Sequence, residues 1–209
     1  MTPPTVNAYY DPAMNDINFP AGILQPPFFD PRRDMAVNYG GIGAVIGHEM
    51  THGFDDQGRK FDADGNLRDW WTAADGTQFE KRVSCVADEY SGFTTVDDVK
   101  LNGRLTLGEN TADNGGLRVA YLAMEEALKQ NPSDKIDGLT PEQRFFTGFA
   151  QVWCENVTPQ TARNLAATDP HSPGRFRVNG TLQNMPEFQK AYSCKPDAPM
   201  VRPNACRVW

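Results

Sequence analysis

The chain has 209 residues, of which 39% are hydrophobic and 22% are charged, a composition that supports a folded core and excludes a disordered or collagen-like chain. Its 20 Lys and Arg against 27 Asp and Glu give a formal net charge of −7 without a basic cluster, so nucleic acid is not an expected partner. The longest apolar run, residues 42–46, is too short to span a bilayer, and no signal or targeting segment is visible.

Apolar spacing and turn residues predict a mostly helical α+β fold with a small N-terminal sheet. Short strands are expected at residues 5–10 and 17–24. Helices are expected at residues 39–54, 72–90, 107–130, 140–153, 159–167 and 186–192. Because no repeat, low-complexity tract or flexible linker interrupts this pattern, residues 1–209 are expected to form one domain.

Four cysteines, Cys85, Cys154, Cys194 and Cys206, lie far apart in the chain. None forms a CxxC pair, so neither a zinc ribbon nor a thioredoxin-like motif is present. Spacing alone leaves three disulfide pairings open, and it fits four unpaired thiols equally well.

The chemically informative segment is His48-Glu49-Met50-Thr51-His52, an HExxH pattern. Residues four apart on a helix lie about 40° apart around its axis, so both imidazoles can bind one metal ion. In zinc peptidases with this pattern, the glutamate is the general base that takes a proton from the attacking water. The pentapeptide also occurs by chance. However, residues 40–47 contain four glycines, each of which destabilises a helix by up to ~1 kcal/mol relative to alanine, and this indicates close backbone packing around the site.

A catalytic zinc needs a third protein ligand, and the candidate is Glu109 at the start of the helix expected at residues 107–130. Asp113 follows four residues later on the same helical face, where it can accept a hydrogen bond from a ligand histidine and so select its tautomer. The alternative is that both are acids favoured near a helix N-terminus by the helix dipole.

The chain has only three histidines, and the third, His171, lies in a Pro/Gly-rich loop expected at residues 169–177. The simplest interpretation is a lone surface histidine. Its place beside two arginines, Arg175 and Arg177, favours a second interpretation, in which it donates a hydrogen bond to the oxyanion formed when water adds to a peptide carbonyl.

Six ordered motifs together resemble the neprilysin and endothelin-converting-enzyme family of zinc endopeptidases. They are Asn7-Ala8-Tyr9-Tyr10, residues 19–29, residues 38–56, residues 108–116, residues 169–177 and the terminal Cys206-Arg207-Val208-Trp209. The resemblance covers almost the whole chain, and it implies a zincin fold of the thermolysin-like gluzincin type.

The resemblance also implies a role for each site residue. His48, His52 and Glu109 would bind one Zn²⁺ per chain, Glu49 would be the catalytic base, and Asp113 would lie behind His48. His171 would stabilise the transition state. Arg177 would hold a substrate carbonyl, and Asn7 and Ala8 would bind the backbone of a peptide substrate that adds to the sheet edge like a strand.

For substrate choice, the resemblance implies a pocket for a large apolar side chain after the scissile bond. The residues expected to line it are Ile23, Phe28, Val45, Val152 and Trp153. Plain core packing is the alternative for each of them.

The chain departs from this family in length, because family members are several times longer and carry a large helical N-terminal domain that closes over the site. The resemblance implies a Cys85–Cys206 disulfide, with the partners of Cys154 and Cys194 in the absent region, and an extracytoplasmic location. Without the lid domain, we expect another chain to cover the open cleft. The competing function is a non-hydrolytic, zinc-containing peptide-binding fragment that needs a separate lid chain.

Overall fold

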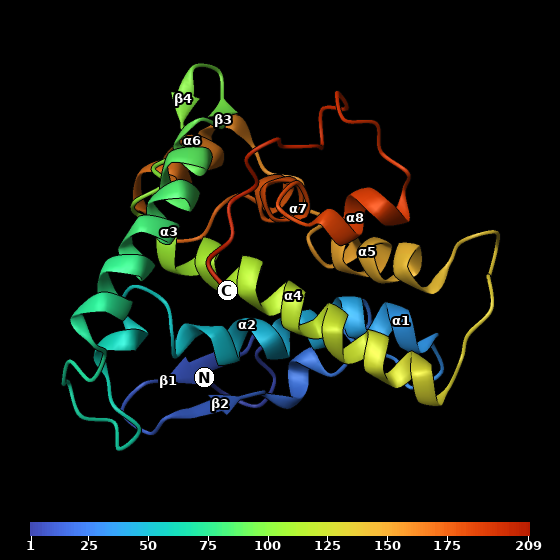
Figure 1. Cartoon of the computed structure of the whole chain (residues 1–209), viewed down its shortest axis with the longest axis horizontal. Helices are drawn as coiled ribbons and strands as arrows, with labels where there is room; N and C mark the ends of the chain where they lie inside the picture. Colours follow the sequence, from blue (N-terminus) through green and yellow to red (C-terminus); the bar gives the residue numbers. More distant parts are fainter.

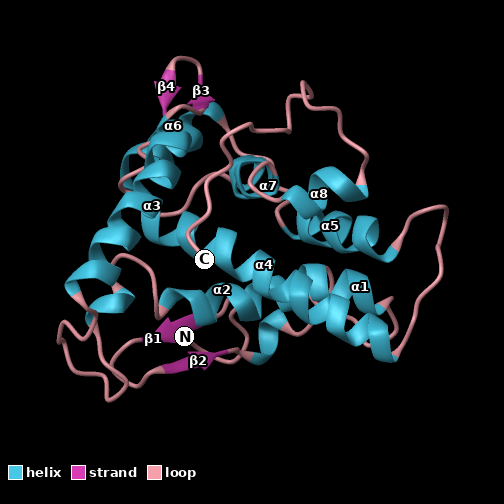
Figure 2. Cartoon of the chain, in the orientation of Figure 1, coloured by secondary structure: helices cyan, strands magenta, loops and turns pink.

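The computed structural model describes all 209 residues and is mostly helical (Figure 2). The α-helices are α1 Met35–Asn38, α2 Ala44–His52, α3 Ala73–Ser91, α4 Leu107–Gln130, α5 Pro141–Val152, α6 Pro159–Thr168, α7 Gly174–Leu182 and α8 Pro186–Ala191. The strands are β1 Tyr9–Asp11, β2 Asp16–Asn18, β3 Thr94–Val96 and β4 Val99–Lys100. Three short helical turns complete the chain: the 3₁₀ turns Ala21–Ile23 and Gly58–Lys60, and the π-helical turn Tyr39–Gly43.

The predicted helix starts are confirmed where the sequence carries a capping residue. Thr72 accepts a hydrogen bond from the backbone N–H of Asp75 at the start of α3. At α5, Thr140 and Gln143 form a reciprocal capping box, with Pro141 in the first turn. These polar side chains satisfy backbone groups that would otherwise lack partners, so local sequence is sufficient to set where these helices begin.

Helices α2 and α4 pack closely side by side across the middle of the molecule (Figure 1). A Cβ atom at Gly47 would lie 2.4 Å from the carbonyl oxygen of Gly116, and one at Gly116 would lie 2.3 Å from the backbone nitrogen of His48. Gly40 is equally close to α5, since its Cβ would lie 2.0 Å from the carbonyl oxygen of Phe145. The expected close backbone packing around the HExxH segment is therefore present.

The N-terminal sheet is shorter than predicted. Only β1 and β2 pair, antiparallel, with Tyr10 opposite Ile17. The strand expected at residues 17–24 ends at Asn18, and a 3₁₀ turn replaces its second half. This turn follows from Gly22, whose N–H donates to the carbonyl of Pro3 and whose missing side chain lets the segment approach Pro4. A second hairpin, β3–β4, lies far from the first (Figure 2) and was not predicted.

The expectation of a loop throughout residues 169–177 is wrong, because α7 begins at Gly174 and carries Arg177 in its first turn. Its sequence, Gly-Arg-Phe-Arg-Val-Asn-Gly-Thr-Leu, has no apolar stripe at helical spacing. Tertiary contacts hold the helix instead: Gly180 lies directly against the ring of Tyr90, and Thr181 is completely buried.

Two apolar clusters form the core, and α4 contributes to both. Leu107 belongs to the cluster around α3, whereas Leu117 and Met124 belong to the cluster that contains Phe145 and Phe149 of α5. The part of α4 between Leu107 and Leu117 therefore spans the junction of the two clusters. This is the segment that contains the candidate ligand Glu109.

The outer faces of α2 and α4 keep several large apolar side chains exposed. Val119 and Leu122 are exposed on α4, and Ile46 and Met50 are exposed on α2. No helix is both long enough and apolar enough to span a membrane.

Candidate metal centre

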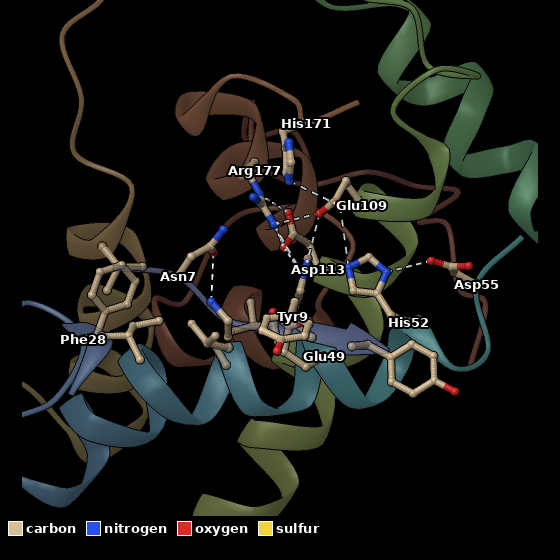
Figure 3. A pocket seen from close by; sticks show the side chains of 18 of the residues that line it. Asn7, Tyr9, Phe28, Glu49, His52, Asp55, Glu109, Asp113, His171 and Arg177 are labelled. Atoms are coloured by element: carbon tan, nitrogen blue, oxygen red, sulfur yellow. Dashed lines mark hydrogen bonds and ion pairs between the residues drawn. The ribbon is translucent and has the colours of Figure 1, made fainter. Parts of the chain in front are cut away.

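Three side chains from two helices converge on one point in front of α2 (Figure 3). His48 Nε2 lies 2.9 Å from His52 Nε2 and 3.2 Å from Glu109 Oε2, and His52 Nε2 lies 3.6 Å from Glu109 Oε1. The two histidines come from successive turns of α2, and Glu109 comes from the first turn of α4. The close α2–α4 packing therefore brings the three predicted ligands together.

These separations fit a tetrahedral zinc ion. Donor atoms bound at about 2.0–2.1 Å around a tetrahedral centre lie about 3.3 Å from one another, within the range seen here. In addition, Glu109 Oε2 is buried and has no hydrogen-bond donor, so it carries an unmet requirement for positive charge. Two imidazoles and a carboxylate also form the donor set that zinc accepts in catalytic sites.

Glu49 has a different position from the three converging groups. Its ligand atoms lie within 4.8 Å of those of His48 and His52, so proximity alone does not separate it from a ligand. However, neighbouring residues on a helix point about 100° apart, which directs Glu49 beside His48 rather than at the same point. Glu49 is buried, and this burial raises the pKa of its carboxyl group. A carboxyl group with a raised pKa is suited to accept and return a proton.

Each histidine is held by its own carboxylate. His48 Nδ1 lies 2.8 Å from Asp113 Oδ1, and His52 Nδ1 lies 2.7 Å from Asp55 Oδ2. With Nδ1 as the donor to these carboxylates, both Nε2 atoms present a lone pair to the centre. The structure therefore brings Asp113 together with His48. Asp55 was missed, although its position three residues after His52, just beyond the end of α2, is a usable signal.

Arg177 balances the negative charge of Asp113, the carboxylate that holds His48. Its Nε and Nη2 both donate to Asp113, at 2.7 Å each, and its guanidinium lies 3.9 Å from the centre of the Trp153 ring. Although burial opposes the effect, this pairing and the contact with His48 lower the pKa of Asp113 well below its usual range. Asp113 therefore stays ionised.

The ligand cluster itself attracts positive charge. Burial alone would lower the pKa of His48, but the close contacts with the carboxylates of Asp113 and Glu109 outweigh it and raise that pKa to about 9. The pKa of Glu109 is lowered to about 2, against the effect of burial, mainly through its contact with His48. A cation between the rings and Glu109, whether a proton or a metal ion, is thus favoured.

His171 reaches the centre from the opposite side (Figure 3). Its Nε2 lies 3.3 Å from Glu109 Oε1, while its Nδ1 lies 2.7 Å from Asp169 Oδ1. Asp169 therefore holds the ring so that Nε2 points into the site. Sequence reasoning missed Asp169 as this partner, although its spacing of two residues from His171 is a usable signal.

The centre opens into a cleft with a volume of about 660 Å³. All of the predicted substrate-contacting residues line it: Asn7, Ala8, Ile23, Phe28, Val45, Val152, Trp153 and Arg177. Ala8 immediately precedes β1, and its N–H donates to the side chain of Asn7 at 3.0 Å. Residues of β1 and a group of apolar side chains thus line the same cleft.

Comparison with known proteins identifies the family. The model for peptidase family M13 matches residues 7–208. The chain belongs to peptidase family M13. Within this family, it is 51% identical to human endothelin-converting enzyme 1 over 212 residues, which cover all of this chain and 27% of that protein. It is 50% identical to neprilysin-1 of Caenorhabditis elegans, covering 98% of this chain and 28% of that protein.

A solved M13 structure shows the same fold. The chain matches Mycobacterium tuberculosis zinc metalloprotease ZMP1 in complex with an inhibitor, with a TM-score of 0.93 and 50% identity, over 100% of this chain and 33% of that one. The fold is thus the mostly helical, zincin-type catalytic domain of this family. The chain spans between a quarter and a third of the length of these relatives.

Proposed function

We propose that this M13 chain is the catalytic domain of a zinc-dependent endopeptidase that hydrolyses short peptides. The observation that supports this most directly is the convergence of His48, His52 and Glu109 within 2.9–3.6 Å, beside the buried Glu49 and at the bottom of an open cleft. Three protein ligands and a neighbouring general base describe a catalytic site rather than a closed structural one.

His48, His52 and Glu109 would hold one zinc ion. When bound, zinc would supply a Lewis acid for the peptide carbonyl and would make water a stronger acid. Glu49 would then accept a proton from the attacking water and deliver it to the nitrogen of the leaving amine.

Charge that develops on the carbonyl oxygen would be stabilised from the opposite side of the cleft. As an imidazolium, His171 would donate from Nδ1 to Asp169 and from Nε2 to this oxygen. Arg177, which faces the same cleft, would hold a neighbouring carbonyl of the substrate. Asn7 and Ala8 would bind the substrate backbone along the free edge of β1.

The apolar part of the cleft supports a preference for a large apolar residue after the scissile bond. Phe28, Val45, Val152 and Trp153 line that part together with the fully buried Ile23. A pocket without an acidic or basic side chain among these residues would favour an apolar side chain over a charged one.

The Glu49→Gln variant separates the endopeptidase from a zinc-containing fragment that only binds peptides. Glutamine keeps the size of the side chain but removes the base, so we expect about one zinc per chain and a 10²- to 10⁴-fold lower rate of peptide hydrolysis. The measurements are metal content and cleavage of a short peptide with an internal Phe or Leu. Glu126→Gln, an exposed change on α4 that removes only the ion pair with Lys129, is the control.

Two outcomes contradict parts of this proposal. Full activity in Glu49→Gln removes Glu49 as the base, and full zinc retention in His52→Ala removes the ligand assignment. A wild-type chain that binds zinc and peptide but cleaves nothing would favour the binding fragment, which needs a separate lid chain.

We also propose that a further polypeptide covers the exposed apolar side chains on α2 and α4. In addition, we propose that the enzyme acts outside the cytoplasm. Exposed Ile46, Met50, Val119 and Leu122 on α2 and α4 support the first point. The disulfide between Cys85 and Cys206 supports the second, since such bonds persist in oxidising compartments. Light scattering tests the association, and a strict monomer whose full activity is confined to short peptides would contradict it.

A further inference from the structure

The proposed transition-state role of His171 requires a fixed position, yet its own surroundings do not fix it. Its side chain is 47% exposed. The partner at its Nδ1, Asp169, lies two residues away on the same loop, and the backbone N–H of His171 donates to the same carboxylate at 2.8 Å. These two hydrogen bonds set the orientation of the ring relative to the loop. They do not set the position of the loop relative to α4, which carries Glu109.

A buried chain of hydrogen bonds makes that second connection. Ser172, only 4% exposed, donates from Oγ to Asn110 Oδ1 at 2.6 Å. Asn110 is completely buried, and its Nδ2 donates to Thr106 Oγ1 at 2.8 Å. Thr106 Oγ1 in turn donates to the carbonyl of Asn102 at 3.2 Å. The residue after His171 is thus tied to the residue after Glu109.

The side chain of Asn110 is suited to this place because it accepts from Ser172 with its oxygen and donates to Thr106 with its nitrogen. An aliphatic residue would leave the Ser172 hydroxyl without a partner in the interior, which would destabilise this arrangement. A chain of buried and mutually satisfied hydrogen bonds has one low-energy arrangement. It therefore fixes the distance between the loop and the helix.

We propose that Ser172 and Asn110 are positioning residues that hold His171 in register with Glu109. This inference rests on the proposed endopeptidase function. Its physical basis is that an error of about 1 Å in the placement of a catalytic group can lower a rate by up to about 100-fold. The hydrogen bond between Ser172 and Asn110 limits such an error, because these residues directly follow His171 and Glu109 in the chain.

Another strong anchor of the loop leads away from α4. The backbone N–H of Gly174 donates to Glu155 Oε1 at 2.6 Å, which ties the far end of the loop to the segment after α5. If this anchor alone positioned His171, loss of the Ser172 hydroxyl would leave the loop unchanged. The two anchors therefore make different predictions for the Ser172→Ala variant.

The kinetic test is a double-mutant cycle between Ser172→Ala and His171→Ala in the zinc-loaded chain. We expect Ser172→Ala alone to lower kcat roughly tenfold, with KM changed less than about twofold, because misplacement weakens transition-state rather than ground-state contacts. We expect His171→Ala to lower kcat by about 100-fold or more. In the His171→Ala background, Ser172→Ala should cause no further loss, since it acts through the missing imidazole.

A second readout does not depend on activity. Amide hydrogen exchange across residues 171–174 should become at least about tenfold faster in Ser172→Ala and in Asn110→Ala, because the loop loses its link to α4. Zinc content should stay at the wild-type level. Ser91→Ala is the matched control: its hydroxyl also links a helix to a loop, through Ala87 and Gly103, but it makes no hydrogen bond to residues 171–174. It should lose stability without faster exchange in residues 171–174.

Three results would overturn the proposal. They are an equal loss of kcat from Ser172→Ala in both backgrounds, an effect on KM alone, and unchanged exchange in residues 171–174. Failure of the endopeptidase function would look different, because the wild-type chain would then cleave nothing. In that case hydrogen exchange decides the question alone: faster exchange in both variants supports the link, and unchanged exchange rejects it.

Discussion

Asp113 shows how much of this site depends on one buried carboxylate. It contacts His48 Nδ1 through one oxygen, and it forms a two-point ion pair with Arg177 through both. The first contact selects the tautomer that leaves His48 Nε2 free for metal. The second keeps a buried guanidinium paired, and this matters because an unpaired buried charge destabilises a fold strongly.

Removing this carboxylate should therefore affect metal and fold together. We expect Asp113→Ala to weaken zinc binding by about 10- to 100-fold, the usual range for a residue that orients a ligand. We expect it to lower the free energy of unfolding of the metal-free chain by about 3–5 kcal/mol, because Arg177 loses its partner. Chelator competition and urea unfolding measure the two effects. The exposed variant Asp98→Ala is the control, and unchanged zinc affinity in Asp113→Ala would contradict the assigned role.

At the scale of elements, the decisive feature is the contact between α2 and α4. The three candidate ligands come from these two helices, and Gly47 lies against Gly116 where they cross. Glycine at both positions removes the side chains that would hold the axes apart. The glycines, which weaken each helix by itself, therefore set the distance between the histidines and Glu109.

A methyl group at this contact should separate the helices. In Gly47→Ala the new Cβ would lie 2.4 Å from a backbone oxygen of Gly116, so we expect a loss of about 1–3 kcal/mol in the free energy of unfolding, together with weaker zinc binding. Gly43→Ala is the matched control, because its Cβ would meet nothing closer than the Tyr39 side chain at 3.5 Å and the Asn38 carbonyl oxygen at 3.6 Å, which are ordinary van der Waals contacts. We expect that change to be neutral or stabilising by up to about 1 kcal/mol. Equal behaviour of both variants would argue against the packing explanation.

At the scale of the whole molecule, the C-terminal tail closes the structure. Cys206 forms a disulfide with Cys85 on α3, 121 residues earlier, and its backbone N–H donates to Asn184 at 2.7 Å. Close by, the buried Glu89 accepts from Gln183 and Asn184 and pairs with Arg202 of the tail at 3.0 Å. The tail is thus attached to α3 covalently and through a buried polar network.

Loss of this disulfide should destabilise the chain without changing the metal ligands. We expect Cys85→Ser combined with Cys206→Ser to lower the free energy of unfolding by about 3–5 kcal/mol, on a model-dependent entropy estimate for so long a loop. Denaturant unfolding under oxidising conditions is the measurement. Cys154→Ser combined with Cys194→Ser, which changes the two free thiols, should stay within about 0.5 kcal/mol of wild type. A similar loss in both pairs would reject the entropic explanation.

Local sequence determined the features that depend on residues close together in the chain. The helix at residues 107–130 follows from apolar spacing, the starts of α3 and α5 follow from Thr72 and Thr140, and the i, i+4 spacing of His48 and His52 places both imidazoles on one face. The pattern of motifs also indicated the family, and with it Glu109, Asp113 and His171 as candidates.

Tertiary structure alone decided what depends on contacts between distant segments. Helix α7 forms although its sequence lacks an apolar stripe, because Gly180 and Thr181 pack against Tyr90. The link from Ser172 to Asn110 joins residues 62 positions apart. Such pairings carry no local signal, because their free energy comes from burying and satisfying polar groups that meet only after the helices have packed.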